Sequence, residues 1–282
     1  MNSVTRQFDA AKGTRTGGRS TNQDRSLFLG SPETLFLGLA DGLGGHPRGE
    51  VAAQLLMDVS ETLFRQLPKP LHDPENFMLR CVGKAHSAIM RFGRRQDPPI
   101  APRTTAVMAV IQDGVAHWAH VGDSRLYLIR DGAVFSQTRD HTQVRYVRQS
   151  ENESSRRRAS LTRCLGGLPQ PPTTTCGQPT ALRPGDTLLL CSDGLWSQVR
   201  RQMLVDTLSD YRRPLQPALN ELLERAAGTE NSDNVSAVAI RWLAAATQKS
   251  EQNGATTTTT DPRLQHAIAH LQRVIRQTDE SN

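Results

Sequence analysis

Four aspartates each lie next to the end of a short apolar segment, at a point where the neighbouring residues are small. They occur in Ala40-Asp41-Gly42, Gly122-Asp123-Ser124, Ser192-Asp193-Gly194 and Ser232-Asp233-Asn234. Small neighbours allow a carboxylate to approach a ligand that also touches the backbone. Each aspartate alone is typical of a turn, because Asp and Gly are common turn residues. Four aspartates in equivalent positions predict a shared site instead.

Converging carboxylates repel one another, and removing them from water is costly unless a cation neutralises their charge. Ligands that are all oxygen favour a hard cation, Mg²⁺ or Mn²⁺, whereas zinc and copper sites use His or Cys. Two such ions bridged by one Asp and a water would supply a hydroxide nucleophile and polarise a phosphoryl oxygen. The aspartates therefore predict metal-dependent hydrolysis of a phosphate ester.

Arg19 is the candidate for binding the substrate phosphate, because a guanidinium contacts phosphate oxygens in pairs. Standing alone it would be an ordinary surface Arg. Other phosphate chemistries lack their motifs. No Cys is followed six positions later by Arg, Gly83-Lys84 lacks the upstream Gly of a P-loop, and there is no His-Arg-Asp sequence of a kinase catalytic loop.

The elements that would position these residues are short strands and a few longer helices. Val, Ile, Leu and Thr are enriched in the predicted strands, at residues 25–30, 34–40, 104–112, 115–121, 125–130, 187–191 and 234–243. Asp113-Gly114 and Asp131-Gly132 predict two-residue hairpin turns. Apolar residues at helical spacing predict helices at 49–66, 74–95, 200–209 and 214–227. Because the helices lie between groups of strands, we expect an α+β fold with antiparallel sheets covered by helices.

Composition excludes several classes of protein. The chain has 282 residues, 37% of them hydrophobic, which indicates a folded protein of one large or two small domains. Its net charge of +6 is spread along the chain, so we expect no nucleic-acid binding. No apolar run approaches the length of a membrane span, and residues 1–11 do not resemble a signal peptide. We therefore expect a cytoplasmic protein that does not bind membranes.

Two polar regions interrupt or follow the predicted core. Residues 149–160 predict a mobile surface loop, and 248–261, with five consecutive Thr, predict a linker. Residues 262–282 then predict an amphipathic C-terminal helix, which would pack on its own domain or on a partner. The expected organisation is a catalytic domain at 1–247, a linker at 248–261 and a helix at 262–282.

Taken together, the motifs resemble those of the bacterial metal-dependent protein phosphatases of the type 2C (PPM) family. The matching segments follow the family's order and are residues 19–24, 40–53, 103–107, 121–125, 161–166, 191–196 and 233–236. The resemblance implies a four-layer α/β/β/α sandwich of two antiparallel sheets flanked by helices. The family's usual Gly-Thr-Thr is Arg103-Thr104-Thr105 in this chain.

The resemblance also implies roles for individual residues. Asp41 would bridge two metal ions, and Arg19 would bind the substrate phosphate. The other implied metal ligands are the Gly42 carbonyl and the carboxylates of Asp193 and Asp233, with Asp123 and Asp193 at a third ion. Asp24 would hold metal-bound water, and Asn234 would support Asp233. Asp41, Asp193 and Arg19 are the expected catalytic residues.

The implied activity is hydrolysis of phosphoserine and phosphothreonine in proteins by a metal-bridged hydroxide, with two or three Mg²⁺ or Mn²⁺ ions as cofactors. Expected partners are phosphorylated proteins, among them a bacterial Ser/Thr kinase that the phosphatase would oppose and the substrates of that kinase. The alternative is a catalytically weak phosphoprotein-binding or regulatory module. A complete set of metal carboxylates argues against this alternative, because a degenerate module is expected to lose one.

Overall fold

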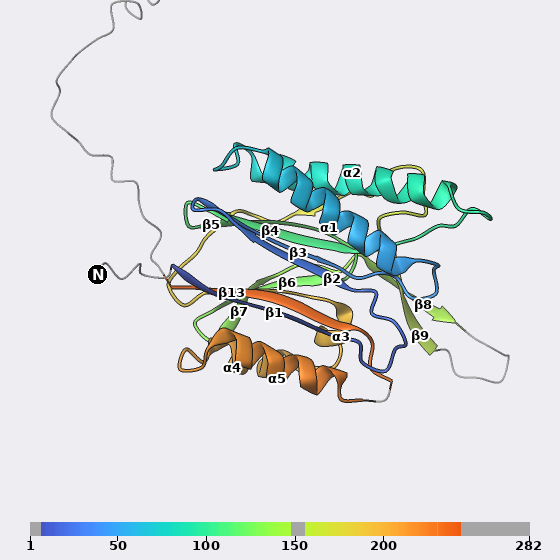
Figure 1. Ribbon diagram of the computed structural model, residues 1–282. Helices are drawn as coiled ribbons and strands as arrows, with labels where there is room; N and C mark the ends of the chain where they lie inside the picture. The colour runs from blue at the N-terminus through green and yellow to red at the C-terminus, as the bar shows by residue number, and fades with distance from the viewer. Residues whose placement is uncertain (1–6, 148–155, 230, 244–282) are drawn as a thin grey trace, which may run out of the picture. The chain divides into compact units, whose positions relative to one another are not determined.

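Two antiparallel sheets lie face to face in this protein, and helices cover both outer faces (Figure 1). The computed structural model describes residues 7–147, 156–229 and 231–243. The predicted α+β sandwich with layers α/β/β/α is therefore confirmed. The predicted linker and C-terminal helix lie outside the described residues. None of the described helices is both long and apolar enough to cross a membrane.

The first sheet has five strands in the order β1-β13-β12-β6-β7. These strands are β1 (Phe8–Arg15), β6 (Arg125–Arg130), β7 (Ala133–Gln137), β12 (Thr187–Cys191) and β13 (Val235–Trp242). The second sheet has the order β10-β5-β4-β3-β2, and β11 also pairs with β5. Its strands are β2 (Arg25–Gly30), β3 (Thr34–Ala40), β4 (Ala106–Gln112), β5 (Val115–Val121), β10 (Thr175–Cys176) and β11 (Thr180–Ala181).

Both predicted hairpin turns are present. Asp113 and Gly114 join β4 to β5 with φ angles of 51° and 71°, and Asp131 and Gly132 join β6 to β7 with the same pair of values. A tight turn with two positive φ angles matches the right-handed twist of the strands it connects. The Asp-Gly pairs thus fix the register of two neighbouring strand pairs.

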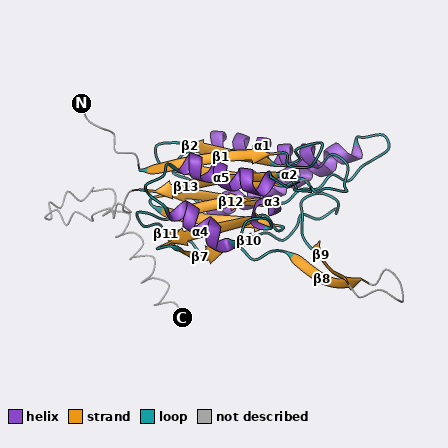
Figure 2. Cartoon of the chain, turned by 90° about the horizontal axis from the view of Figure 1, so that it is seen from below, coloured by secondary structure: helices purple, strands orange, loops and turns teal. Residues whose placement is uncertain are grey.

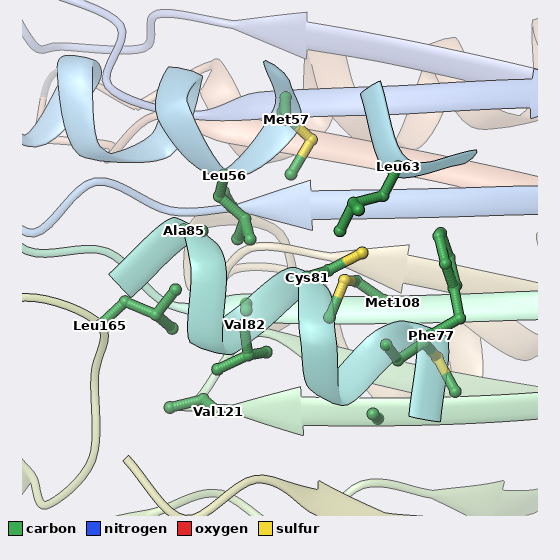
Figure 3. Close-up of a cluster of buried hydrophobic side chains, with 14 of the residues drawn as sticks. Leu56, Met57, Leu63, Phe77, Cys81, Val82, Ala85, Met108, Val121 and Leu165 are labelled. Carbon is green, nitrogen blue, oxygen red and sulfur yellow. The ribbon is translucent and has the colours of Figure 1, made fainter. Parts of the chain in front are cut away.

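The strands are apolar on both faces because each sheet is packed on two sides. In β3, Phe36 faces the helices α1 (Gly49–Gln66) and α2 (Pro74–Arg94), whereas Leu37 faces the other sheet. Alternate residues of a strand point to opposite faces, so both sets must be apolar. Figure 3 shows side chains of α1 and α2, among them Leu56 and Cys81, packed against the sheet beneath them.

The other outer layer contains α3 (Asp193–Trp196), α4 (Arg201–Ser209) and α5 (Leu215–Ala227). Leucines of α4 and α5 pack against β1, β12 and β13, and α5 contacts β1 and β13 most extensively. The helices predicted at 49–66, 74–95, 200–209 and 214–227 are confirmed to within one residue. These helices form the outer layer on the first sheet.

One predicted loop is corrected. Residues 156–160, predicted as part of a mobile loop, belong to β9 (Arg156–Leu161), which pairs antiparallel with β8 (Thr142–Val147). This hairpin projects from the body of the sandwich (Figure 2). The basic, polar sequence of β9 hid the strand, because its residues pair with β8 and do not contribute to either large sheet.

Candidate functional site

Asp41 lies directly after β3, and its backbone is held by two threonines. Its carbonyl oxygen accepts hydrogen bonds from the Thr105 amide and the Thr104 hydroxyl, both at 2.9 Å. Its own amide donates to Thr105 Oγ1 at 3.0 Å. These contacts leave the Asp41 carboxylate free to point away from the strand, beside a turn that begins at Gly42. A Cβ at Gly42 would lie 2.5 Å from the Gly49 carbonyl oxygen, so only glycine fits there.

Asp24 and Asp193 are joined through Ser192. Asp193 is the first residue of α3, immediately after β12 and Ser192. The Ser192 hydroxyl donates to Asp24 Oδ2 at 2.8 Å, and the Ser236 amide donates to the same hydroxyl oxygen at 3.0 Å. Asp24 is buried, and its other oxygen, Oδ1, has no hydrogen-bond partner in the structure.

Asp233 lies just before β13, where Arg19 reaches it from a loop more than two hundred residues earlier. Arg19 Nη2 donates to Asp233 Oδ2 at 2.7 Å, and both side chains are partly exposed, by 55% and 41%. Asp233 Oδ1 accepts from the Asn234 amide at 2.8 Å. The Asn234 side chain donates to the carbonyls of Thr16 and Thr21 and accepts from the Gln23 amide. Asn234 thus holds the loop that carries Arg19.

Asp123 follows β5, and a set of side chains fixes its backbone. The indole Nε1 of Trp196 donates to the Asp123 carbonyl oxygen at 2.9 Å. The guanidinium of Arg125 stacks 3.5 Å from the centre of the Trp196 ring and makes a bidentate contact with Asp140, at 2.8 Å to each oxygen. Asp123 is therefore anchored to α3, the helix that begins at Asp193.

His141 holds the residue before Asp123. Its Nδ1 accepts a hydrogen bond from the Gly122 amide at 3.1 Å, and its own amide donates to the Gly122 carbonyl at 2.9 Å. Its carbonyl accepts from the Thr162 amide at 2.8 Å, so His141 connects Gly122 to the base of the β8–β9 hairpin. Burial lowers the pKa of His141 to about 4, helped by the nearby His120 and Arg163, which keeps Nδ1 an acceptor at neutral pH.

The charges of the predicted carboxylates act on one another. Burial, and then the charges of Asp24, Asp193, Asp123 and Asp233, raise the pKa of Asp41 well above its usual value. Burial raises the pKa of Asp24 and of Asp123 to about 7, and the charge of Asp193 adds to both shifts. Burial and the charge of Asp233 raise the pKa of Asp193, against hydrogen bonds from Asp41 and the Gly194 amide. The predicted carboxylates therefore lie near enough to one another for their charges to affect each other's pKa values.

Within the described residues, no group of three or more His, Cys, Asp and Glu side chains lies close enough together to hold a metal ion as it stands. Arg19 holds Asp233 by an ion pair, and Ser192 holds one oxygen of Asp24. The donors still suit a hard cation, because they are oxygens, carry excess negative charge and include the unpartnered Asp24 Oδ1. A cation would also lower the raised pKa values.

Sequence patterns missed the residues that hold the site together. Trp196 and His141 are not among the predicted site residues. Neither has a local signal, since Trp196 contacts Asp123 and His141 contacts Gly122 only after the chain has folded.

Comparison with known proteins supports this arrangement. A family model described as protein phosphatase 2C matches residues 15–244. The serine/threonine protein phosphatase PstP of Mycobacterium tuberculosis (strain ATCC 25618 / H37Rv) is 32% identical over 236 residues, 81% of this chain and 44% of PstP. The serine/threonine phosphatase stp of Listeria innocua is 25% identical over 231 residues, 79% of this chain and 90% of stp.

Among solved structures, the catalytic domain of PstP in complex with two manganese ions is similar to this chain, with a TM-score of 0.67 and 28% identity, over 84% of this chain and 99% of that one. The chain spans less than half the length of the mycobacterial relative it matches. The matched region nevertheless contains every carboxylate of the site and every strand of the two sheets except β1, of which only Arg15 is included. The chain belongs to the protein phosphatase 2C family.

Proposed function

We propose that this protein is a serine/threonine protein phosphatase that depends on Mg²⁺ or Mn²⁺. The observation that carries the proposal is the convergence of Asp41, Asp193, Asp123 and Asp24 at one end of the sandwich, where burial and mutual repulsion raise their pKa values. Such a cluster is costly without a cation. Membership in the protein phosphatase 2C family supports the same activity.

The proposed ligands of the ions are the carboxylates of Asp41, Asp193 and Asp233 and the carbonyl of Gly42, with Asp123 and Asp193 at a third position. When bound, the ions supply a nucleophile from water at neutral pH and neutralise charge on the phosphoryl group. The bound manganese of the PstP catalytic domain supports this assignment.

The chain's own residues orient the substrate and the carboxylates. Arg19 is partly exposed and lies beside Asp233, so its guanidinium is available to a phosphate at the edge of the cluster. Thr104 and Thr105 fix the Asp41 backbone, and Ser192 fixes one oxygen of Asp24. Asp24 is too buried to meet a protein substrate, and its free Oδ1 is placed to accept a proton from a nearby water.

The proposed substrates are proteins that carry phosphoserine or phosphothreonine, as the names of the mycobacterial and listerial relatives suggest. A Ser/Thr kinase of the same cell is the proposed opposing enzyme, and the cytoplasm is the proposed location. The C-terminal segment at 262–282 is a proposed docking element for a partner or for the catalytic domain at 1–247.

Hydrolysis of p-nitrophenyl phosphate and of a phosphothreonine peptide tests the proposal. We expect turnover with Mn²⁺, none with a chelator, and a loss of at least about a hundredfold in Asp193→Asn, because metal charge contributes several kcal/mol to the barrier. Asp131→Asn is the matched control, since Asn-Gly forms the same hairpin turn as Asp-Gly. Turnover that ignores the chelator, or full activity in Asp193→Asn, would refute the proposal. A folded wild-type protein that binds phosphopeptides without hydrolysing them would favour the regulatory alternative.

A further inference from the structure

Arg103 lies beside the turn that carries Asp41 and Gly42. Its carbonyl oxygen accepts a hydrogen bond from the Leu43 amide at 3.0 Å. The next residue, Thr104, forms isolated bridges with Gly42 on one side and Leu165 on the other. Arg103 therefore lies where its own segment meets the Gly42 turn and the segment at Leu165. The position of its side chain follows from other contacts.

The Arg103 side chain runs between the glycine turn and the segment after β9. A Cβ at Gly167 would lie 2.8 Å from Arg103 Cζ, so the guanidinium packs closely over that glycine. On the other side, burial and the charge of Arg103 lower the pKa of His46. The charge of Arg103 also acts on Cys164, where it opposes the effect of burial on the thiol pKa. The guanidinium is thus bounded by His46, Cys164 and Gly167.

Arg103 differs from the other arginines of the site because it has no anionic partner. Arg19 pairs with Asp233, and Arg125 pairs with Asp140. Among the described residues, no carboxylate forms an ion pair with Arg103, and its buried Nε has no hydrogen-bond partner. A half-buried guanidinium is normally paired or hydrogen-bonded, because leaving it unpaired costs free energy.

The ligand that suits this position is an anion. Because Arg103 lies beside the carboxylate cluster, we expect the anion to be part of the substrate. Thr104, the residue after Arg103, donates its hydroxyl to the Asp41 carbonyl at 2.9 Å, so the Arg103 backbone lies near Asp41. Arg19 lies near Gly44 of the same turn, with Nη1 3.9 Å from the place of a Cβ on that glycine. Two cations therefore flank the turn, and only Arg19 is engaged with the aspartates. A substrate that extended from the cluster across this turn would meet Arg103, because the Arg103 backbone borders the turn.

We propose that Arg103 is a specificity-determining residue that binds an acidic group of the substrate close to the phosphorylated residue. The inference rests on the proposed phosphatase function and adds the sequence context of its substrates. Residues of an extended peptide are about 3.3 Å apart, so positions within three residues of the phosphoresidue cover about 10 Å on either side of it and are the ones to test. The group is a carboxylate of Asp or Glu, or a second phosphate, since both offer the paired oxygens that a guanidinium binds.

A series of phosphothreonine peptides tests this inference. Each peptide carries one Glu, one phosphoserine or one Gln at a single position within three residues of the phosphothreonine. For wild type we expect kcat/KM to be about tenfold higher with the acidic group at the best position than with Gln, the effect of one charge-assisted hydrogen bond. The effect should lie mainly in KM, because the contact is made before and during the reaction alike.

Substitutions of Arg103 test whether this residue causes the preference for an acidic group. The ratio of kcat/KM between acidic and Gln peptides should fall to near one in Arg103→Gln and persist in part in Arg103→Lys. In Arg103→Glu the preference should reverse, so that a Lys-flanked peptide has the higher kcat/KM. A structural role alone would not reverse it. Arg91→Gln, an exposed arginine of α2, is the matched control and should keep the wild-type ratio. A ratio that stays at the wild-type value in Arg103→Gln, or that does not reverse in Arg103→Glu, overturns the inference.

Binding separates this inference from the phosphatase activity itself. Fluorescence polarisation with peptides that carry a non-hydrolysable phosphonate, flanked by Glu or by Gln, needs no turnover. If wild type hydrolyses no substrate but binds the Glu peptide about tenfold more tightly, and Arg103→Gln binds the two peptides equally, the proposed function fails and the assignment of Arg103 stands. Equal affinities for the two peptides overturn the assignment whether or not the protein is active.

Discussion

Replacing Asp123 with Asn should stabilise the metal-free protein at pH 8 and have little effect at pH 4. Asp123 belongs to the carboxylate cluster, where burial and the charges of Asp193 and Asp140 raise its pKa from 3.8 to about 7. Asn has nearly the same shape and no charge. The substitution therefore removes repulsion without opening a cavity, and the Trp196 contact to the Asp123 backbone can remain.

The size of the stabilisation by Asp123→Asn and its pH dependence follow from the raised pKa of Asp123. Between about pH 4 and pH 7 the folded chain keeps a proton that the unfolded chain has released, so the free energy of unfolding falls as pH rises through this range. A shift of about three pKa units corresponds to about 4 kcal/mol at pH 8. Neighbouring carboxylates share the repulsion and solvent screens part of it, so we expect a gain of about 1–4 kcal/mol in Asp123→Asn.

Urea denaturation in the presence of a chelator, at pH 4 and pH 8, measures this gain directly. Asp131→Asn, at an exposed hairpin turn, controls for the loss of one negative charge and should show no such difference between the two pH values. If Asp123→Asn is no more stable than wild type at pH 8, or if the same gain is found at both pH values, the carboxylates do not repel one another as described.

Two further perturbations test one support of the site, His141, and one buried ion pair away from the site, Arg130 with Asp186. His141→Ala removes the acceptor of the Gly122 amide, so the free energy of unfolding should fall by about 1–2 kcal/mol, and His141→Asn, which offers an oxygen near the place of Nδ1, should recover part of it in the same denaturation assay. Asp186→Ala leaves the buried Arg130 guanidinium unpaired and should cost about 3–5 kcal/mol, whereas joint replacement of Asp186 by Leu and Arg130 by Met should cost less. Equal losses in the single and double variants would contradict the second expectation.

Local patterns predicted the elements whose own residues determine them. The strands at 25–30 and 34–40 and the helix at 49–66 have the predicted bounds, because periodic apolar residues and turn residues mark them. β1 was missed. Its sequence, Phe-Asp-Ala-Ala-Lys-Gly-Thr-Arg, has one large apolar residue, and the strand exists because all eight of its residues pair with β13, more than two hundred positions away. Such pairing leaves no trace in the strand's own sequence.

The same distinction holds for the site. Asp41, Asp123, Asp193 and Asp233 were predicted because each follows an apolar strand or precedes one with a small neighbour. What holds them was not predicted, since the contacts depend on side chains that meet only in the fold. Trp196 supports Asp123 in this way, and Asn234 supports the Arg19 loop through its side chain.

The anomalous scattering of manganese in crystals of this protein tests the central proposal most directly. We expect at least two manganese peaks, with a carboxylate oxygen of Asp41 within about 2.6 Å of both and oxygens of Asp193 and Asp233 at the same distance from one of them, as hard cations require. Crystals of Asp193→Asn grown under the same conditions should lack at least one of these manganese peaks. Manganese bound elsewhere, or no manganese within coordination distance of Asp41 at millimolar concentration, would contradict the account.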